Sequence, residues 1–185
     1  MFRQLNAIIE IKDISDMRLV KTTNGVYIQI RKSHPLFDVI RTNFDAPLDK
    51  IINELSGKTI IFRTDDFDAI DALLFKIKEI QLQNLLFIAS KNIDLLLYVK
   101  RKTKGKILTL IELDVISYDK KFYDILLKHY RIDGVIFPVE TYNRIPTEVL
   151  SLNNEYYILV KGIDINSEYK ISNTKYIDYI IFTIQ

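Results

Sequence analysis

The chain has no cysteine and no tryptophan, and only two histidines, four prolines and five glycines occur among its 185 residues. The absence of cysteine excludes disulfides and thiolate chemistry and fits a reducing compartment. Two histidines, His34 and His129, are too few for a histidine metal cluster, and neither has a nearby partner that would make a catalytic triad. The sequence therefore predicts neither a metal nor another cofactor.

Long apolar runs are also absent. No stretch approaches the roughly 18 consecutive apolar residues that a membrane-spanning helix needs. The N-terminal segment MFRQLNAIIEIKD has charges inside its apolar stretch and no cleavage site, unlike a signal peptide. The formal net charge is only +2, which permits a nucleic-acid partner without indicating one. These features predict a cytoplasmic protein with no membrane partner.

Short apolar runs rich in Ile, Val, Tyr and Phe recur along the whole chain, about 23 residues apart. Several lack polar alternation, as strands buried on both faces do. Between them lie helical patterns, clearest over 68–80, 93–99 and 120–130. Eight strands alternating with helices predict an α/β fold, a compact (β/α)8 TIM-type barrel formed as one domain by residues 1–185. The runs are AIIEI (7–11), VYIQI (26–30), TIIF (59–62), LLFIA (85–89), ILTLI (107–111), VIFPV (135–139), YYILV (156–160) and YIIFTI (179–184).

Two segments carry further expectations. In 120–130, the helical spacing places Phe122, Ile125, Leu126 and His129 on one apolar stripe, so His129 is expected to be structural. The segment 33–48 has two prolines and is expected to be a lid or a long strand-to-helix connection.

Four of the five glycines stand just before a predicted strand or at its first residue. At these positions, Gly25, Gly57, Gly105 and Gly134, a preceding helix would end and need a left-handed residue. Gly162 instead follows a strand, so it is expected on the face where α/β proteins bind ligands.

The segment SGKTIIFRTDD (56–66) begins like a phosphate-binding loop and ends in two carboxylates. A P-loop needs a glycine where Ile52 stands and a helix after the motif, so the start is expected to be a helix end that enters a strand. Asp65, Asp66 and Asp68 follow that strand, and they suit either helix capping or a ligand site. Asp65 is the one most expected to face inward.

Other polar residues stand near predicted strand ends and would share that ligand-binding face. Because exposed amides and lysines both stabilise negative charge, lysines with Gly162 suit a phosphate-type anion. Polar residues gather at any strand end, so a purely structural role stays open. The residues are Glu10, Lys12, Asp13, Gln29, Arg31, Lys32, Ser90, Lys91, Thr109, Glu112, Asp114 and Lys161.

The densest basic run is KRKTKGK (100–106), which is expected at a helix end opposite that face. Lysines at a helix C-terminus are favoured by the dipole, so a solvated helix end explains the run. The alternative is a contact with nucleic-acid phosphates, with Tyr98 and Tyr130 available for stacking.

The order of these elements resembles the glycerol-3-phosphate-responsive antiterminator family along nearly the whole chain. The motifs that carry the resemblance are NAIIEIKDISDM, GKTIIFRTDDF, IASK, LTLIELD, VIFPV and VKGID. Asp65, Lys91, Asp114, Pro138 and Gly162 match the family's residues at the ends of its strands. The chain departs from the family at Thr109, Val139, Lys161 and Thr183.

This resemblance implies a non-catalytic regulatory protein that binds a small phosphate-bearing ligand of the glycerol-3-phosphate type, with RNA as a second partner. By the same resemblance, Lys161 and Gly162 would hold the phosphate, Lys91 would add charge, and Asp65 would hold hydroxyls. Asp114 matches the family's aspartate and belongs to the same site.

The layout also resembles glycerophosphodiester phosphodiesterase barrels. That chemistry needs histidines and a metal-binding carboxylate cluster, but Gln29 and Arg31 stand where carboxylates are expected, so such an enzyme would be degenerate. Two further hypotheses remain. One is a phosphoryl-sugar enzyme using Asp65, Glu112 or Lys91 for proton transfer. The other is a barrel kept for protein–protein contact.

Overall fold

The structure is a computed structural model that describes residues 6–34, 37–42, 47–80, 85–114, 117, 119–166 and 170–184. The strands are β1 (Asn6–Glu10), β2 (Gly25–His34), β3 (Phe37–Thr42), β4 (Thr59–Arg63), β5 (Leu86–Ser90), β6 (Leu108–Glu112), β7 (Gly134–Pro138), β8 (Tyr157–Asp164) and β9 (Tyr179–Thr183). The α-helices are α1 (Leu48–Ile51), α2 (Phe67–Ile80), α3 (Ile93–Thr103), α4 (Lys120–Asp124), α5 (Val139–Tyr142) and α6 (Thr147–Leu150). The 3-10 helices are η1 (Ile14–Thr22), η2 (Ile52–Leu55), η4 (Ser151–Asn154) and η5 (Thr174–Tyr176), and a π-helix, η3 (Ile125–His129), continues α4.

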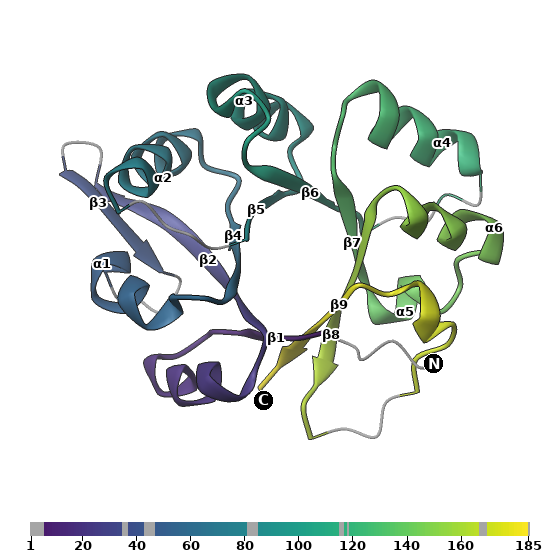
Figure 1. Cartoon of the computed structure of the whole chain (residues 1–185), viewed down its shortest axis with the longest axis horizontal. Helices are drawn as coiled ribbons and strands as arrows, with labels where there is room; N and C mark the ends of the chain where they lie inside the picture. Colours follow the sequence, from purple (N-terminus) through teal and green to yellow (C-terminus); the bar gives the residue numbers. More distant parts are fainter. Residues whose placement is uncertain are drawn as a thin grey trace.

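Eight of the strands form a closed parallel barrel with the helices around its outside (Figure 1). The order is β1-β9-β8-β7-β6-β5-β4-β2, and parallel pairing of β1 with β2 closes the ring. The predicted α/β barrel is therefore confirmed, and every one of the eight predicted strands lies within a residue or two of its predicted start. Among the described residues, no helix is both long and apolar enough to cross a membrane.

Apolar side chains fill both faces of the barrel sheet, which is why the strands read as continuous apolar runs. One cluster fills the inside of the barrel, and a larger one lies between the sheet and the surrounding helices. In each strand, alternate residues face the barrel interior. The buried interior set is Ile8, Tyr27, Ile61, Phe87, Ala89, Leu110, Ile136, Leu159 and Ile181.

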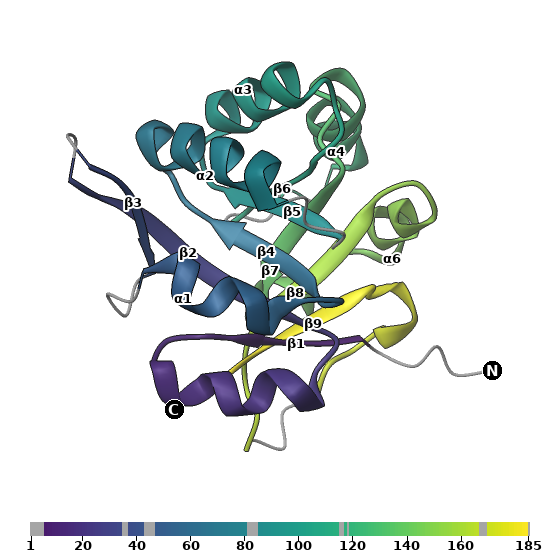
Figure 2. The ribbon, with the colours of Figure 1, turned by 60° about the vertical axis from the view of Figure 1, so that its left-hand side comes forward.

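The segment expected to be a lid or a connection contains a ninth strand. β3 pairs antiparallel with the far end of β2, with Ile30 opposite Thr42 and Lys32 opposite Ile40. Figure 2 shows this β2–β3 pair projecting beyond the barrel. Because it extends β2 past the carboxyl end of the barrel, it stands on the face that carries the other strand ends. Residues 35–36 and 43–46 of the segment, and the side chain of His34, lie outside the described part of the chain.

The glycine prediction is right at two of four positions. Gly57 and Gly105 have φ values of 74° and 73°, the left-handed conformation expected after a helix. Gly25 and Gly134 do not adopt it. A Cβ at Gly25 would lie 2.3 Å from the carbonyl oxygen of Thr59, and one at Gly134 would lie 2.4 Å from that of Tyr157. These two glycines allow neighbouring strands to approach closely at the amino end of the barrel.

Replacing Gly134 by alanine should therefore cost more stability than replacing Gly57. The added Cβ at Gly134 meets backbone that cannot move aside alone, so we expect a loss of about 3 kcal/mol, the upper end for overpacking. At Gly57 no atom lies within 4 Å of an added Cβ. The only loss of stability there comes from holding an alanine in the left-handed conformation, which costs about 1 kcal/mol. Urea unfolding of both variants measures the difference. Equal losses would contradict the close-approach explanation.

The helix predicted over 120–130 buries a different face from the one expected. Tyr123, Leu126 and Leu127 are buried, whereas Phe122 and Ile125 are 42% and 58% exposed. His129 is exposed as well, so its predicted place in an apolar stripe is wrong. The π-helix of η3 adds a residue to the turn, which rotates the following side chains relative to a regular α-helical stripe.

Candidate functional site

A layer of four charged side chains closes the barrel interior at the carboxyl ends of the strands. They come from β1, β4, β6 and β8, which are alternate strands of the barrel, as in the side-chain layers of other barrels of this type. Around the ring the charges alternate: the members are Glu10, Arg63, Glu112 and Lys161. The layer, here called the charged layer, carries no net formal charge.

Glu112 is the centre of the charged layer and is only 4% exposed. The Tyr27 hydroxyl donates to its Oε1, the Lys161 Nζ lies 3.1 Å from the same oxygen, and the Arg63 Nε lies 3.4 Å from Oε2. Burial of Tyr27 and the neighbouring negative charge of Glu112 both raise the pKa of Tyr27 well above its ordinary value, so Tyr27 donates as a neutral phenol. A buried carboxylate needs this many donors to offset its lost hydration.

Arg63 links the charged layer to a second carboxylate, Asp65, with which it forms an ion pair. Asp65 also accepts hydrogen bonds from Ser90 Oγ at 2.5 Å and from the backbone amide of Lys91 at 3.0 Å. Burial opposes the charge on Asp65, but these hydrogen bonds and Arg63 together lower its pKa. The resulting stability is present above the ordinary pKa of aspartate and is lost only as the pH falls through the lowered value.

Lys91 and Asp114 form the rim of the site. Their side chains are 47% and 53% exposed and pair with each other. The hydrogen bond between them raises the pKa of Lys91 and lowers that of Asp114. An exposed pair of this kind adds little stability, so Lys91 can turn toward a ligand at small cost.

Glu10 is the member of the charged layer without a close hydrogen-bond donor among the described contacts. Burial raises its pKa, the nearby Lys12 and Lys161 partly offset this, and Glu112 adds to it. The nitrogen of Lys12 lies 3.9 Å from its carboxylate. As the pH falls toward the raised pKa, Glu10 takes up a proton and the charged layer gains net positive charge.

Gly162 follows Lys161 within β8 and has a φ of 88°. It lies at a β-bulge, where the register with β9 shifts between Lys161 and Ile163. No atom lies within 4 Å of the position of an added Cβ, so the space beside this backbone is open. Bulges recur next to active sites because they redirect a side chain, and here the bulge directly follows the lysine that contacts Glu112.

The structure places all five predicted site residues at the carboxyl end of the barrel, two of them with the charged layer and three nearer the rim. Lys161 and Gly162 lie with the charged layer, and Asp65, Lys91 and Asp114 lie toward the rim. Glu112, expected as a candidate proton-transfer residue, is the buried centre rather than a rim carboxylate.

Asp66 is confirmed as a helix-capping residue. Its side chain accepts from the Asp68 amide at 2.9 Å, and its carbonyl accepts from the Ile70 amide. Asp68 lies in the first turn of α2 and is exposed. Thr109 is at the opposite end of the barrel from the site, where its amide and hydroxyl both donate to Asp133, so its grouping with Glu112 and Asp114 is wrong.

Sequence reasoning missed Tyr27 and Arg63. Tyr27 stands inside the apolar run VYIQI and Arg63 directly follows the apolar run TIIF, and such runs do not by themselves show which residues face the barrel interior. A signal does exist. Arg63 follows the interior residue Ile61 by two positions, as Glu112 follows Leu110 and Lys161 follows Leu159.

No protein-family model and no curated protein matches the chain. Solved structures show the same fold. A protein from Galdieria sulphuraria that is assigned by name to the glycerophosphodiester phosphodiesterases aligns with a TM-score of 0.69 over 97% of this chain and 94% of that chain, at 9% identity. An Oleispira antarctica phosphodiesterase in complex with its product sn-glycerol-3-phosphate aligns with a TM-score of 0.63 over 96% and 92%, at 11% identity. Phosphoribosylanthranilate isomerase from Thermotoga maritima aligns with a TM-score of 0.58 over 97% and 87%, at 14% identity.

Glycerophosphodiester phosphodiesterase chemistry needs a cluster of carboxylates for a divalent metal. In the described part of this chain, no group of three or more His, Asp or Glu side chains is arranged to hold a metal ion. Glu112 and Asp65 are held instead by Arg63 and Lys161, whose charges would repel a cation. The residues present at the site therefore do not fit a divalent metal.

Proposed function

We propose that the chain binds a small, hydroxylated phosphate ester of the glycerol-3-phosphate type at the carboxyl end of the barrel, in a role other than metal-dependent hydrolysis. The observation that carries this proposal is the position of Lys161 beside the open backbone at Gly162. Ligand sites of these barrels lie at the same end, and lysines with exposed backbone stabilise phosphate there. Support from outside the chain comes from the barrel fold shared with phosphodiesterases.

In this proposal Lys161 and the backbone at Gly162 hold the phosphate, and Lys91 turns inward from the rim to add charge. Asp65, already an acceptor for two hydrogen bonds, accepts from a ligand hydroxyl. Arg63 stays with Glu112: burial lowers the pKa of Arg63, but Glu112 and Asp65 more than offset this, so it remains charged. Because the charged layer is neutral overall, binding is expected to be moderate rather than tight.

Titration with sn-glycerol-3-phosphate, followed by melting temperature and calorimetry, tests the proposal. We expect saturable binding that raises the melting temperature at millimolar ligand, because a ligand that binds only the folded chain stabilises it by mass action. Glycerol and inorganic sulfate at the same concentrations are the controls. A folded chain whose melting temperature does not change with glycerol-3-phosphate would contradict the proposal.

Replacing Glu10 by glutamine should tighten that binding at neutral pH. The substitution removes one negative charge from the charged layer, and with water-like screening one such charge at about 4 Å is worth about 1 kcal/mol, or roughly fivefold in Kd. As the pH falls, the phosphate ligand loses charge equally for both proteins. Glu10 also takes up its proton in the wild type, so the wild type should gain affinity relative to Glu10→Gln, which lacks this part of the pH dependence. Calorimetric titrations of both proteins across the same pH series measure it. An unchanged Kd would show that Glu10 does not face the ligand.

A second candidate is proton transfer on a phosphorylated sugar, which the inward-facing Glu112 favours. Its oxygens already accept from Tyr27 and contact Arg63 and Lys161, so a substrate proton must compete for them. Incubation of the chain with phosphorylated pentoses and hexoses, read by proton exchange with D2O, tests this role. Exchange that Glu112→Gln abolishes would support it.

The antiterminator resemblance, with RNA as a second partner, stays a prediction. It shares the ligand class of the proposal but adds a regulatory role. A change in the gel mobility of an RNA leader transcript on addition of the chain, seen only with glycerol-3-phosphate present, would support the regulatory role. Ligand binding without any such change would support the proposal alone.

A further inference from the structure

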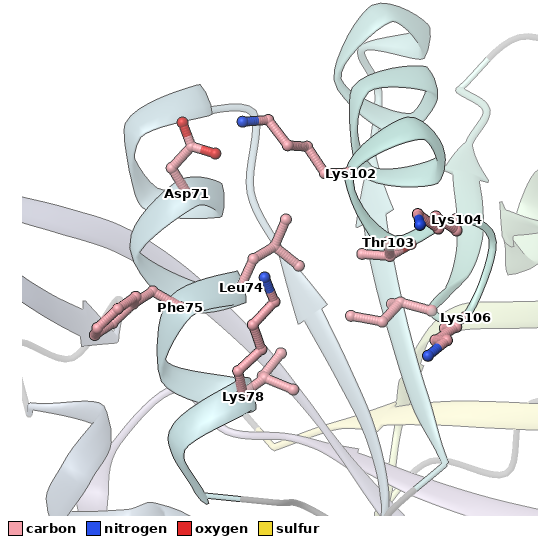
Figure 3. A pocket seen from close by; sticks show the side chains of 10 residues that line it. Asp71, Leu74, Phe75, Lys78, Lys102, Thr103, Lys104 and Lys106 are labelled. Carbon is pink, nitrogen blue, oxygen red and sulfur yellow. The ribbon is translucent and has the colours of Figure 1, made fainter.

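A groove separates α2 from α3 on the outside of the barrel, away from the charged layer. Its volume is about 630 Å³, and Figure 3 shows the side chains that line it between the two helices. Each helix of the barrel runs from the carboxyl ends of the strands back toward their amino ends. The groove lies near the C-terminal ends of α2 and α3, so it lies toward the amino end of the barrel. The lining residues are Asp71, Leu74, Phe75, Ile77, Lys78, Lys102, Thr103, Lys104, Lys106 and Ile107.

The floor of the groove is apolar. Leu74 and Ile107 are 8% and 9% exposed and belong to the core between sheet and helices, and Ile77 packs against that core. On α2 the lining positions 71, 74, 75 and 78 recur at helical spacing, so they form a stripe that runs along the helix. An occupant must therefore offer apolar side chains along a line.

The rim of the groove is basic. Among its described residues, the lining holds a single carboxylate, Asp71, and four lysines, which gives it a larger positive charge than the whole chain has: these are Lys78, Lys102, Lys104 and Lys106. Lys102 lies 5.2 Å from the centre of the Tyr98 ring, and Figure 3 shows its amine facing Asp71. Among the described residues, no ion pair involves any of these four lysines. The helix dipole favours lysine at each helix end, but it does not account for the apolar channel between the ends.

We propose that the groove between α2 and α3 docks an acidic amphipathic segment of a partner protein. Apolar side chains spaced at i, i+3, i+4 and i+7 would enter the channel over Leu74, Ile77 and Ile107, and flanking carboxylates would meet the lysine rim. This pairing satisfies both features of the groove at once, and charge complementarity also speeds association.

The same surface suits a nucleic acid less well. Single-stranded nucleic acid binds where aromatic rings offer stacking platforms beside the basic groups. Phe75 is the one aromatic residue in the described lining, and Figure 3 shows its ring at the outer edge of the groove, on the side of α2 away from α3. Tyr98 packs edge-on against Phe67 with ring centres 5.6 Å apart. The apolar floor would also stay uncovered beneath a phosphate backbone.

Selection of random 15-residue peptides displayed on phage, with the full chain as bait, tests this inference. We expect enriched peptides to combine several Asp or Glu residues with apolar residues at helical spacing. A synthetic copy of the most enriched peptide should bind Lys78→Glu/Lys106→Glu at least about tenfold more weakly than wild type, measured by fluorescence anisotropy. Lys120→Glu/Lys121→Glu is the matched control, because both lysines are exposed in the first turn of α4, which tolerates acidic residues.

Several outcomes would overturn the inference. One is an absence of acidic amphipathic peptides among those enriched. Another is an equal loss of peptide binding in the control variant, which would show attraction to net charge alone. A third is tighter binding of a 20-nucleotide single-stranded RNA than of the peptide, with the RNA displacing the peptide from the groove. Melting temperatures of both double variants confirm that they are folded.

Discussion

Replacing Glu112 by alanine is expected to lower the free energy of unfolding by about 3 kcal/mol, the low end of the range for breaking a buried ion pair. The loss comes from the partners left behind. Without Glu112, the Tyr27 hydroxyl loses its acceptor and the half-buried Lys161 amine loses the carboxylate 3.1 Å from it. Arg63 keeps Asp65, and Lys161 is a quarter exposed, which is why the upper end of the range is not expected.

Asp114→Ala is the matched control for this prediction. It also removes a carboxylate that pairs with a lysine at the same end of the barrel, but that pair is half exposed and should contribute no more than about 1 kcal/mol. Urea unfolding of the two variants, with Glu112→Gln between them, measures the contrast. If the Glu112 and Asp114 variants lost similar stability, the charged layer would not be the tightly held structure described here.

Replacing Lys161 by methionine is expected to weaken glycerol-3-phosphate binding about thirtyfold. A charge-assisted hydrogen bond to phosphate contributes about 2 kcal/mol. The substitution also leaves the charged layer with a net negative charge that repels the ligand. The fold should persist, because Glu112 keeps its contacts with Tyr27 and Arg63.

Two lysine variants separate this role from general charge. Lys91→Met, on the rim, should weaken binding only a few-fold, and Lys106→Met, in the groove between α2 and α3, should not change it. Lys161→Arg should recover part of the affinity, since it restores the charge in a bulkier form. Calorimetry on all four variants provides the comparison. Similar losses for Lys106→Met and Lys161→Met would contradict a site at the charged layer.

The barrel could be predicted from the sequence because its strands are buried on both faces. Burial makes each strand a short apolar run, and the recurrence of such runs with helices between them leaves few other folds. Because the strands are apolar on both faces, the charged layer could not be predicted in the same way. Where both faces of a strand are apolar, the sequence does not reveal which face lines the interior, so Arg63 and Tyr27 passed unnoticed.

Other differences have local causes. β3 is short, mixes charged with apolar residues (FDVIRT) and pairs antiparallel with an extension of β2, so it gives no sign of a buried parallel strand. The π-helix of η3 moved His129 out of a stripe that regular helical spacing had predicted. Gly25 and Gly134 serve the packing between strands, a long-range contact that their neighbours in sequence do not indicate. The positions of Lys161 and Gly162 near the carboxyl end of the barrel were predictable because they stand after the apolar run YYILV, although β8 does not end there and continues through Gly162 to Asp164.

The five glycines allow the most direct test of the proposed site. In a chain labelled with 15N-glycine, each backbone amide gives its own NMR signal, and three are well placed: Gly162 beside the charged layer, and Gly57 and Gly105 away from it. Titration with sn-glycerol-3-phosphate should shift the Gly162 signal in a saturable way and leave the Gly57 and Gly105 signals in place. An unchanged Gly162 signal at saturating millimolar ligand, or a shift of Gly105 in its place, would contradict binding at the carboxyl end of the barrel.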